Sequence, residues 1–81
     1  MQRVSGQRDA EDVLGKIGMA VRSARKSQGL SQEALADAAG IDRSHMGKIE
    51  RGERNVTILN VVRISVALNT RPSEMLASAG L

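Results

Sequence analysis

Residues 31–52, SQEALADAAGIDRSHMGKIERG, predict two short helices joined by a tight turn. Ser31 and Asp42 are favourable N-cap residues, because each side chain can accept a hydrogen bond from a free amide of the next turn. Gly40 and Gly52 suit helix ends, since glycine adopts positive φ without steric cost. This compact pair constrains how every other segment can pack. The two helices are expected at about 32–39 and 43–51.

Regular apolar spacing predicts a longer helix before this pair, at about 11–28. Its apolar residues recur three and four positions apart, which places them on one helix face: Leu14, Ile17, Val21 and Ala24. Gly15 and Gly18 interrupt the pattern and weaken the helix by roughly 1 kcal/mol each relative to Ala. We interpret both glycines as sites where another helix approaches closely.

The C-terminal third of the chain predicts two more helices. Thr57 can cap a helix at about 58–68, and Pro72 can begin another at about 72–79, although Arg71 before it is a poor cap. The chain also lacks Cys, Phe, Tyr and Trp. Its core must therefore come from aliphatic residues and Met, which favours close-packed helices. We predict an all-α fold of five helices.

The 81 residues allow one small domain. Residues 1–10 show no periodicity and are expected to be a flexible tail, whereas residues 11–81 form the domain. Arg3 and Arg8 in the tail either contact phosphates or are simply solvated. No segment approaches the ~18 uninterrupted apolar residues of a membrane span, and no signal peptide is apparent. A cytoplasmic location without membrane association is therefore expected.

The charge balance is mildly basic, and its position is informative. The formal net charge is +3, from 12 Lys and Arg against 9 Asp and Glu. On a helical wheel, the helix at 43–51 turns Met46 and Ile49 inward, while its polar and basic residues face outward. Gly47 removes a side chain from the middle of that outer face. A helix of this kind can lie close against another surface.

The helix at 58–68 carries more apolar residues than one buried stripe needs. One face contains Ile58, Val61, Ile64, Ser65 and Leu68, and the adjacent face contains Leu59, Val62 and Val66. A single small domain buries only the first face. The second face is therefore a candidate dimer interface, unless it packs on the fifth helix of the same chain.

The central pattern resembles the XRE-type, lambda-repressor-like helix-turn-helix family of DNA-binding regulators. The resemblance runs from about Val21 to Leu76, and its most specific part is GLSQEALADAAGIDRSHMGKIERGERN, residues 29–55. The positions that fit the two-helix unit are Gln32, Leu35, Ala36, Gly40, Ile41, Met46 and Ile49. The family implies a five-helix fold in which the third helix enters the major groove of double-stranded DNA.

The resemblance also implies which residues contact DNA. Arg43, Ser44, His45 and Lys48 match base-contacting positions, and the Arg43 guanidinium suits guanine O6 and N7. The family more often has Tyr or Thr where this chain has His45. The expected backbone-phosphate contacts are Ser31, Gln32, Arg51, Arg54 and Asn55. Each of these charges and polar groups also has an ordinary reading as solvated surface.

Two further residues match a structural pair of the family. Arg25 and Glu50 correspond to an ion pair between the first and third helices. A glutamate on a DNA-facing surface would repel phosphate, so a structural role is expected for Glu50.

Within the family, IDRSHMGKIERGERNVT looks most like the small controller proteins of restriction-modification systems. That resemblance implies a homodimeric transcription factor that regulates its own gene and binds a near-palindromic operator. No effector domain fits into the chain, so no small-molecule effector is expected.

Other functional classes have less support. His45 is the only histidine and cysteine is absent, so neither a catalytic site, a metal site nor a cofactor is expected. The main alternative is an antitoxin-type or other protein-binding module on the same fold. Salt-dependent DNA binding would distinguish a DNA-binding regulator from a pure interaction module.

Overall fold

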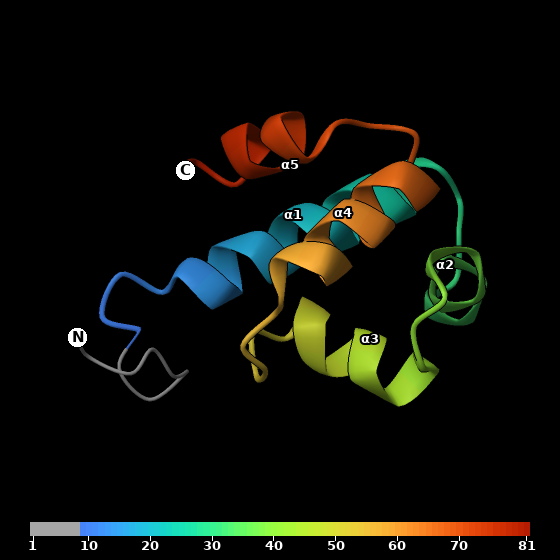
Figure 1. Cartoon of the computed structure of the whole chain (residues 1–81), viewed down its shortest axis with the longest axis horizontal. Helices are drawn as coiled ribbons and strands as arrows, with labels where there is room; N and C mark the ends of the chain where they lie inside the picture. The colour runs from blue at the N-terminus through green and yellow to red at the C-terminus, as the bar shows by residue number, and fades with distance from the viewer. Residues whose placement is uncertain (1–8) are drawn as a thin grey trace.

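The computed structural model describes residues 9–81, and this range contains five α-helices and no β-strand. The bounds are α1 Val13–Ser27, α2 Gln32–Ala39, α3 Arg43–Glu50, α4 Ile58–Ala67 and α5 Pro72–Ser78. All five expected helices are thus confirmed, with ends that differ from expectation by at most two residues. Helices α3 and α5 lie on opposite sides of the molecule, with α1 and α4 between them (Figure 1).

Local hydrogen bonds explain why three of the helices begin where they do. The side-chain oxygens of Ser31, Asp42 and Thr57 each accept from a backbone amide of the following turn, at 3.0, 3.1 and 3.1 Å. These are the three caps expected from the sequence. Arg71 makes no side-chain cap, and α5 begins instead on Pro72, whose missing N–H is not needed there.

Helix α1 has a cap that the sequence did not reveal. The two carboxylate oxygens of Asp9 accept from the amides of Val13 and Leu14, both at 2.7 Å. Asp9 belongs to the segment that the sequence predicts to be a tail, and in the structure its side chain caps α1. Arg3 and Arg8, the proposed phosphate contacts of the tail, lie outside the described residues.

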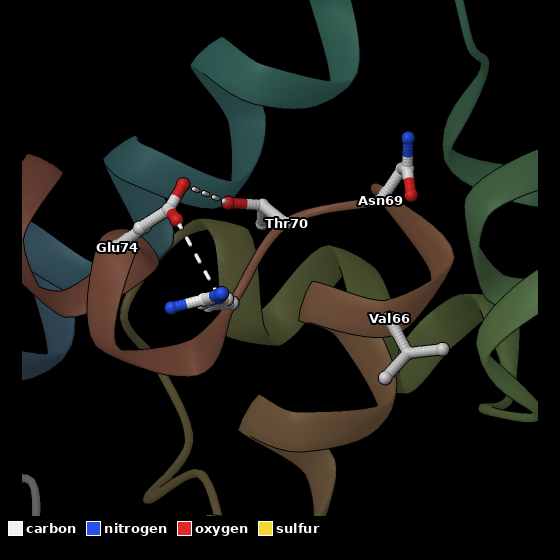
Figure 2. A pocket seen from close by; sticks show the side chains of 5 residues that line it. Val66, Asn69, Thr70 and Glu74 are labelled. Atoms are coloured by element: carbon white, nitrogen blue, oxygen red, sulfur yellow. Dashed lines mark hydrogen bonds and ion pairs between the residues drawn. The ribbon is translucent and has the colours of Figure 1, made fainter.

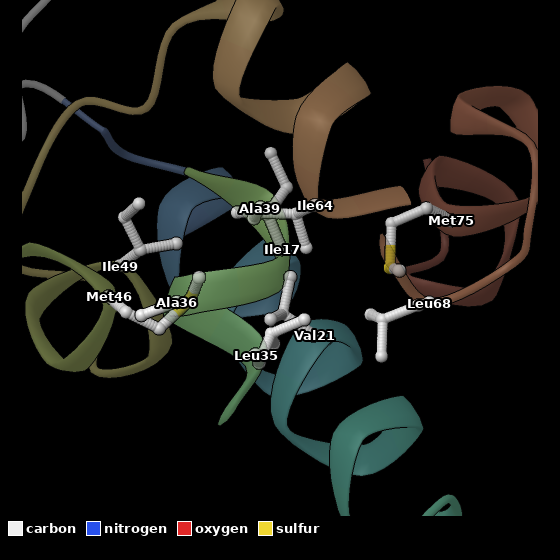
Figure 3. Packing of buried hydrophobic residues seen from close by; sticks show 10 residues of the cluster. All are labelled: Ile17, Val21, Leu35, Ala36, Ala39, Met46, Ile49, Ile64, Leu68 and Met75. Carbon is white, nitrogen blue, oxygen red and sulfur yellow. The ribbon is translucent and has the colours of Figure 1, made fainter. Parts of the chain in front are cut away.

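The core is built from small and medium aliphatic side chains contributed by all five helical segments. Figure 3 shows its ten buried members: Ile17, Val21, Leu35, Ala36, Ala39, Met46, Ile49, Ile64, Leu68 and Met75. Met46 and Ile49 anchor α3 to this core, as the helical wheel predicted. The outward face of α3 is therefore held in a fixed orientation relative to the rest of the domain.

Glycine allows α1 and α3 to meet backbone to backbone. A Cβ atom on Gly18 would collide with the carbonyl oxygens of Ile49 and Glu50. In the turn after α3, a Cβ on Gly52 would lie only 2.9 Å from the Cα and N of Gly15. Gly18 therefore marks a close approach between helices, as expected. Gly15 instead approaches the turn at Gly52, and a Cβ on Gly15 itself would meet the Asp12 carboxylate. Both contacts bring the end of α3 against the first half of α1.

Helix α4 differs from the expected pattern at its first residue. Ile58 was assigned to the buried face, but its side chain is 75% exposed. It sits in the first turn, before the helix reaches the core, and the remaining buried face begins at Val61. The second face stays exposed as well, so α5 of the same chain does not bury it: Leu59 is 56% exposed, Val62 37% and Val66 68%.

Candidate nucleic-acid interface

The four residues expected to read bases lie on the first two turns of α3. Arg43 and Ser44 are exposed, whereas His45 and Lys48 are half-buried. All four belong to α3, which lies at the edge of the molecule (Figure 1). Their opposite neighbours Met46 and Ile49 are buried, so α3 presents one apolar and one polar face. The helix can therefore approach a second surface without losing its own packing.

The beginning of α3 is organised around Asp42. Its carboxylate accepts from the Ser44 amide and also from the Ser44 hydroxyl. The hydrogen bond from the Ser44 side chain, followed by hydrogen bonding from the backbone amides of His45 and Ser44, lowers the pKa of Asp42 below its usual value. The Ser44 proton is thus engaged within the chain. In this state Ser44 can offer a lone pair to a ligand, and it can donate only after leaving Asp42.

The expected partners Arg25 and Glu50 lie together as a forked ion pair between α1 and α3. Arg25 Nε donates to Glu50 Oε2 at 2.7 Å, and Nη2 donates to Oε1 at 3.0 Å. The third guanidinium nitrogen, Nη1, donates to the carbonyl of Leu30 at 2.8 Å. The Glu50 side chain is only 1% exposed. Hydrogen bonding to Glu50 raises the pKa of Arg25 despite the opposing effect of burial.

Glu50 also holds the first residue of α2, a contact that sequence reasoning missed. Gln32 Nε2 donates to Glu50 Oε1 at 3.0 Å. One carboxylate thereby ties together α1, α2 and α3. The family pattern had assigned Gln32 to a backbone phosphate, and its half-buried amide instead has a protein partner here. The phosphate contact stays a prediction.

Gly47 lies under side chains from two segments, although the helical wheel placed it outward. A Cβ on Gly47 would be 3.1 Å from Nη1 of Arg51 and 3.5 Å from Oε1 of Gln32. Gly47 is therefore buried beneath these two side chains. The absence of a side chain lets Arg51 and Gln32 converge over the middle of α3.

The remaining phosphate candidates are exposed and lie at the ends of the helix pair. Arg51 forms a forked pair with Glu53, with Nε to Oε2 at 2.9 Å and Nη2 to Oε1 at 3.3 Å. This contact raises the pKa of Arg51 and lowers that of Glu53. Arg54 and Asn55 follow in an exposed loop, and Ser31 caps α2 from an exposed position.

The exposed apolar face of α4 borders a surface hollow of about 400 Å³. Figure 2 shows Val66 at its edge, with Asn69, Thr70 and Glu74 around the remainder. Thr70 Oγ1 donates to Glu74 Oε2 at 3.2 Å, so the polar side of the hollow is internally paired. Residues 9–81 contain no group of three or more His, Cys, Asp or Glu residues arranged to hold a metal. Nor does this range include a helix that is long and apolar enough to cross a membrane.

The chain is similar to known proteins over most of its length. Residues 21–75 match the helix-turn-helix family. Control protein C.SmaI of Serratia marcescens is 44% identical over 73 residues, which cover 90% of this chain and 83% of that protein. The restriction-modification controller protein C.AhdI of Aeromonas hydrophila shares the fold with a TM-score of 0.75 and 45% identity, covering 76% of this chain and 94% of that one.

The chain is also similar to a protein whose structure was solved in complex with DNA. The restriction-modification controller protein C.Esp1396I, a tetramer bound to its natural 35 base-pair operator, has a TM-score of 0.74 and 31% identity. The match covers 83% of this chain and 92% of that one. The match to the family and the similarity to these proteins confirm the predicted fold. The chain belongs to the XRE-type, lambda-repressor-like helix-turn-helix family, in which its relatives include restriction-modification controller proteins.

Proposed function

We propose that this chain is a sequence-specific double-stranded DNA-binding transcriptional regulator that acts as a homodimer on a near-palindromic operator. Its regulated genes are those of a restriction-modification system, including its own gene. The observation that supports this proposal most directly is the buried Arg25–Glu50 ion pair, which connects α3 to α1. With α3 held in this way, its polar face is directed toward solvent. This geometry supports a rigid reading helix, and the operator-bound relative C.Esp1396I supports DNA as the ligand.

In this mechanism α3 lies in the major groove, which is wide enough for one helix. Arg43 offers two guanidinium donors to guanine, Lys48 offers an ammonium group, and His45 and Ser44 contact base edges near the helix start. Phosphate contacts fix the register of the protein without reading sequence. The proposed phosphate contacts are Ser31, Gln32, Arg51, Arg54 and Asn55.

The exposed face of α4 supports the dimer. Leu59, Val62 and Val66, extended by Ile58, form an apolar surface that a monomer leaves in water. Pairing this face about a two-fold axis would bury it and set two reading helices about 34 Å apart, one turn of DNA. The protein is then a cytoplasmic regulator without enzymatic activity, and changes in its concentration control the fraction of dimer.

Binding-site selection from random duplexes tests the reading helix. The unmodified protein is expected to enrich a two-fold symmetric motif. Arg43→Ala should weaken binding and lose one base preference in each half-site, worth about 1–3 kcal/mol of discrimination. Arg22→Ala, which removes the same charge from an exposed position on α1, is the matched control and should keep the motif. An unchanged motif with Arg43→Ala would overturn the assigned reader.

Salt dependence separates this function from an antitoxin-type or other protein-binding module. Lys and Arg contacts release counterions, so log affinity should fall with log salt at a slope of about −0.9 per neutralised phosphate. A protein-binding module without a DNA partner would show no such slope on any duplex.

Sedimentation tests the dimer. Val66→Glu, at a side chain that is 68% exposed, should shift the protein toward monomer and weaken operator binding. Met19→Glu is the control, because Met19 is comparably exposed at 72% but lies on α1. Equal sedimentation of both variants and the unmodified protein would count against the α4 interface.

A further inference from the structure

Glu53 places a negative charge directly against Arg51, in the segment that follows the reading helix. The two hydrogen bonds, at 2.9 and 3.3 Å, occupy the Nε–Nη2 edge of the guanidinium. Both side chains are about half exposed, at 55% and 54%. Exposed pairs of this kind contribute little stability and open readily in water. Glu53 therefore binds the Arg51 guanidinium without fixing its position.

The position of Arg51 puts this pair beside the basic face of α3. Its Nη1 lies 3.1 Å from the point where a Gly47 side chain would begin, directly over the helix. The charge of Lys48 also helps, after the Arg51 hydrogen bond, to lower the pKa of the Glu53 carboxyl. Glu53 thus acts on the same electrostatic surface as the proposed base-reading and phosphate-binding cations.

We propose that Glu53 competes with a DNA backbone phosphate for Arg51, and thereby weakens DNA binding without contacting a base. The inference rests on the proposed function. Arginine forms the same forked contact with a carboxylate as with a phosphate. A phosphate that reaches Arg51 meets an edge already occupied by Glu53, and the Glu53–Arg51 bonds must open before the phosphate can take that edge.

Two consequences follow from this competition. Removal of the carboxylate should strengthen binding, and the gain should be roughly two- to fivefold, the range expected for an exposed pair. The base preference should not change, because a phosphate contact positions the protein without reading sequence. Glu53 is in this sense a determinant of affinity that acts through Arg51.

The test compares Glu53→Gln with Glu74→Gln. Glu74 pairs with Arg71 at 4.0 Å, is similarly exposed at 65%, and lies on α5, on the opposite side of the molecule from α3 (Figure 1). Both variants therefore remove one negative charge and open one exposed pair. The probe is the duplex recovered by selection with the unmodified protein, together with a scrambled duplex of equal length. Glu53→Gln should bind both duplexes roughly two- to fivefold more tightly than Glu74→Gln does.

The same comparison in an Arg51→Gln background separates exchange of partners from simple repulsion. If Glu53 acts through Arg51, the gain from Glu53→Gln disappears when Arg51 is absent. A gain that persists there overturns the inference in favour of direct repulsion between Glu53 and DNA. Equal affinities of Glu53→Gln and Glu74→Gln also overturn it. If the unmodified protein binds no duplex even at low salt, the proposed function itself fails, and the inference fails with it.

Discussion

The C-terminal end of the reading helix and the turn after it carry two similar ion pairs in opposite environments. Glu50, the last residue of α3, meets Arg25 at 2.7 Å with a side chain that is 1% exposed. Glu53, three residues later, meets Arg51 at 2.9 Å with a side chain that is 54% exposed. Both are arginine–glutamate forks with nearly the same closest distance. Their difference is burial, which determines what each pair can contribute.

Because the Arg25–Glu50 pair (the inner pair) is buried, its role is structural. The Arg51–Glu53 pair (the outer pair) is exposed, so Arg51 can exchange Glu53 for another partner. Removal of one partner from a buried pair leaves a charge without water or a counterion, which is costly. An exposed pair loses little, because water replaces the partner. The inner pair therefore fixes the orientation of α3, whereas the outer pair can exchange its partner for a ligand. Distance alone does not distinguish the two roles.

The largest expected effect comes from breaking the inner pair. Glu50→Ala should reduce the free energy of unfolding by about 3–5 kcal/mol, because Arg25 would stay buried without its carboxylate and Gln32 would lose an acceptor. Urea unfolding followed by circular dichroism measures this loss. For a small domain, such a loss leaves little residual stability. Normal unfolding together with an altered base preference would show that Glu50 belongs to the DNA-binding face instead.

A conservative change at the other partner should have a smaller effect. Arg25→Lys keeps the positive charge but cannot reproduce three directed hydrogen bonds to Glu50 and the Leu30 carbonyl. We expect a loss of about 1–3 kcal/mol in the free energy of unfolding, consistent with losing hydrogen bonds to a charged group. Arg22→Lys on the exposed side of α1 is the control and should unfold like the unmodified protein. Equal stability of both variants would mean that charge, and not the fork, holds α3.

The inner pair illustrates what sequence can predict and what it cannot. The caps at Ser31, Asp42 and Thr57 follow from local chemistry, since each bond spans only two or three residues. The Arg25–Glu50 pair spans 25 residues, and only the resemblance to a family pointed to it. Gln32 joins the same carboxylate from 18 residues away, and no local pattern signals that contact.

Two features at the starts of helices, the Asp9 cap of α1 and the exposure of Ile58 on α4, also have physical causes. Asp9 has no helical periodicity of its own, yet two free amides at the beginning of α1 attract its carboxylate. Ile58 has the right spacing for the core, but it is the first residue of α4 and is 75% exposed. A helical wheel describes angle around the axis and contains no information on how far the neighbouring helices extend. The roles of the site residues toward DNA stay predictions, because DNA contacts depend on a partner.

Acid titration of stability tests Asp42 at the beginning of α3, where we expect an effect smaller than at the buried Arg25–Glu50 pair and larger than at the exposed Arg51–Glu53 pair. Asp42 is exposed like Glu53, but its lowered pKa reflects hydrogen bonds from Ser44 and from the His45 amide at the start of the helix. A lowered pKa means that the stabilisation is complete above the usual value of 3.8 and is lost as pH falls through the folded value. Asp42→Asn keeps a good cap without a titrating group. Its stability at pH 7 should be close to that of the unmodified protein, and it should lose less stability below pH 4.

A control shows whether this effect belongs to the cap. Asp37→Asn removes an exposed carboxylate from α2 that is not at a cap. Below pH 4, the free energy of unfolding of Asp37→Asn should stay closer to that of the unmodified protein than the free energy of unfolding of Asp42→Asn does. If the two variants have the same stability at every acid pH, the change relative to the unmodified protein comes from net charge and not from the cap.

The smallest expected effect on folding is at the outer pair, and it is the sharpest test of the comparison. Arg51 lowers the pKa of Glu53, so any stabilisation from this pair is present above the usual value of 4.5 and is lost as pH falls through the folded value. Because both side chains are half in water, Glu53→Gln should shift the urea midpoint at pH 7 no more than Glu74→Gln does. Added salt should remove any remaining difference, since it screens exposed charges. A large, salt-resistant loss of stability in Glu53→Gln would show that the Arg51–Glu53 pair also holds α3 in place. Opening this pair would then cost too much free energy for Arg51 to exchange Glu53 for a phosphate when DNA binds.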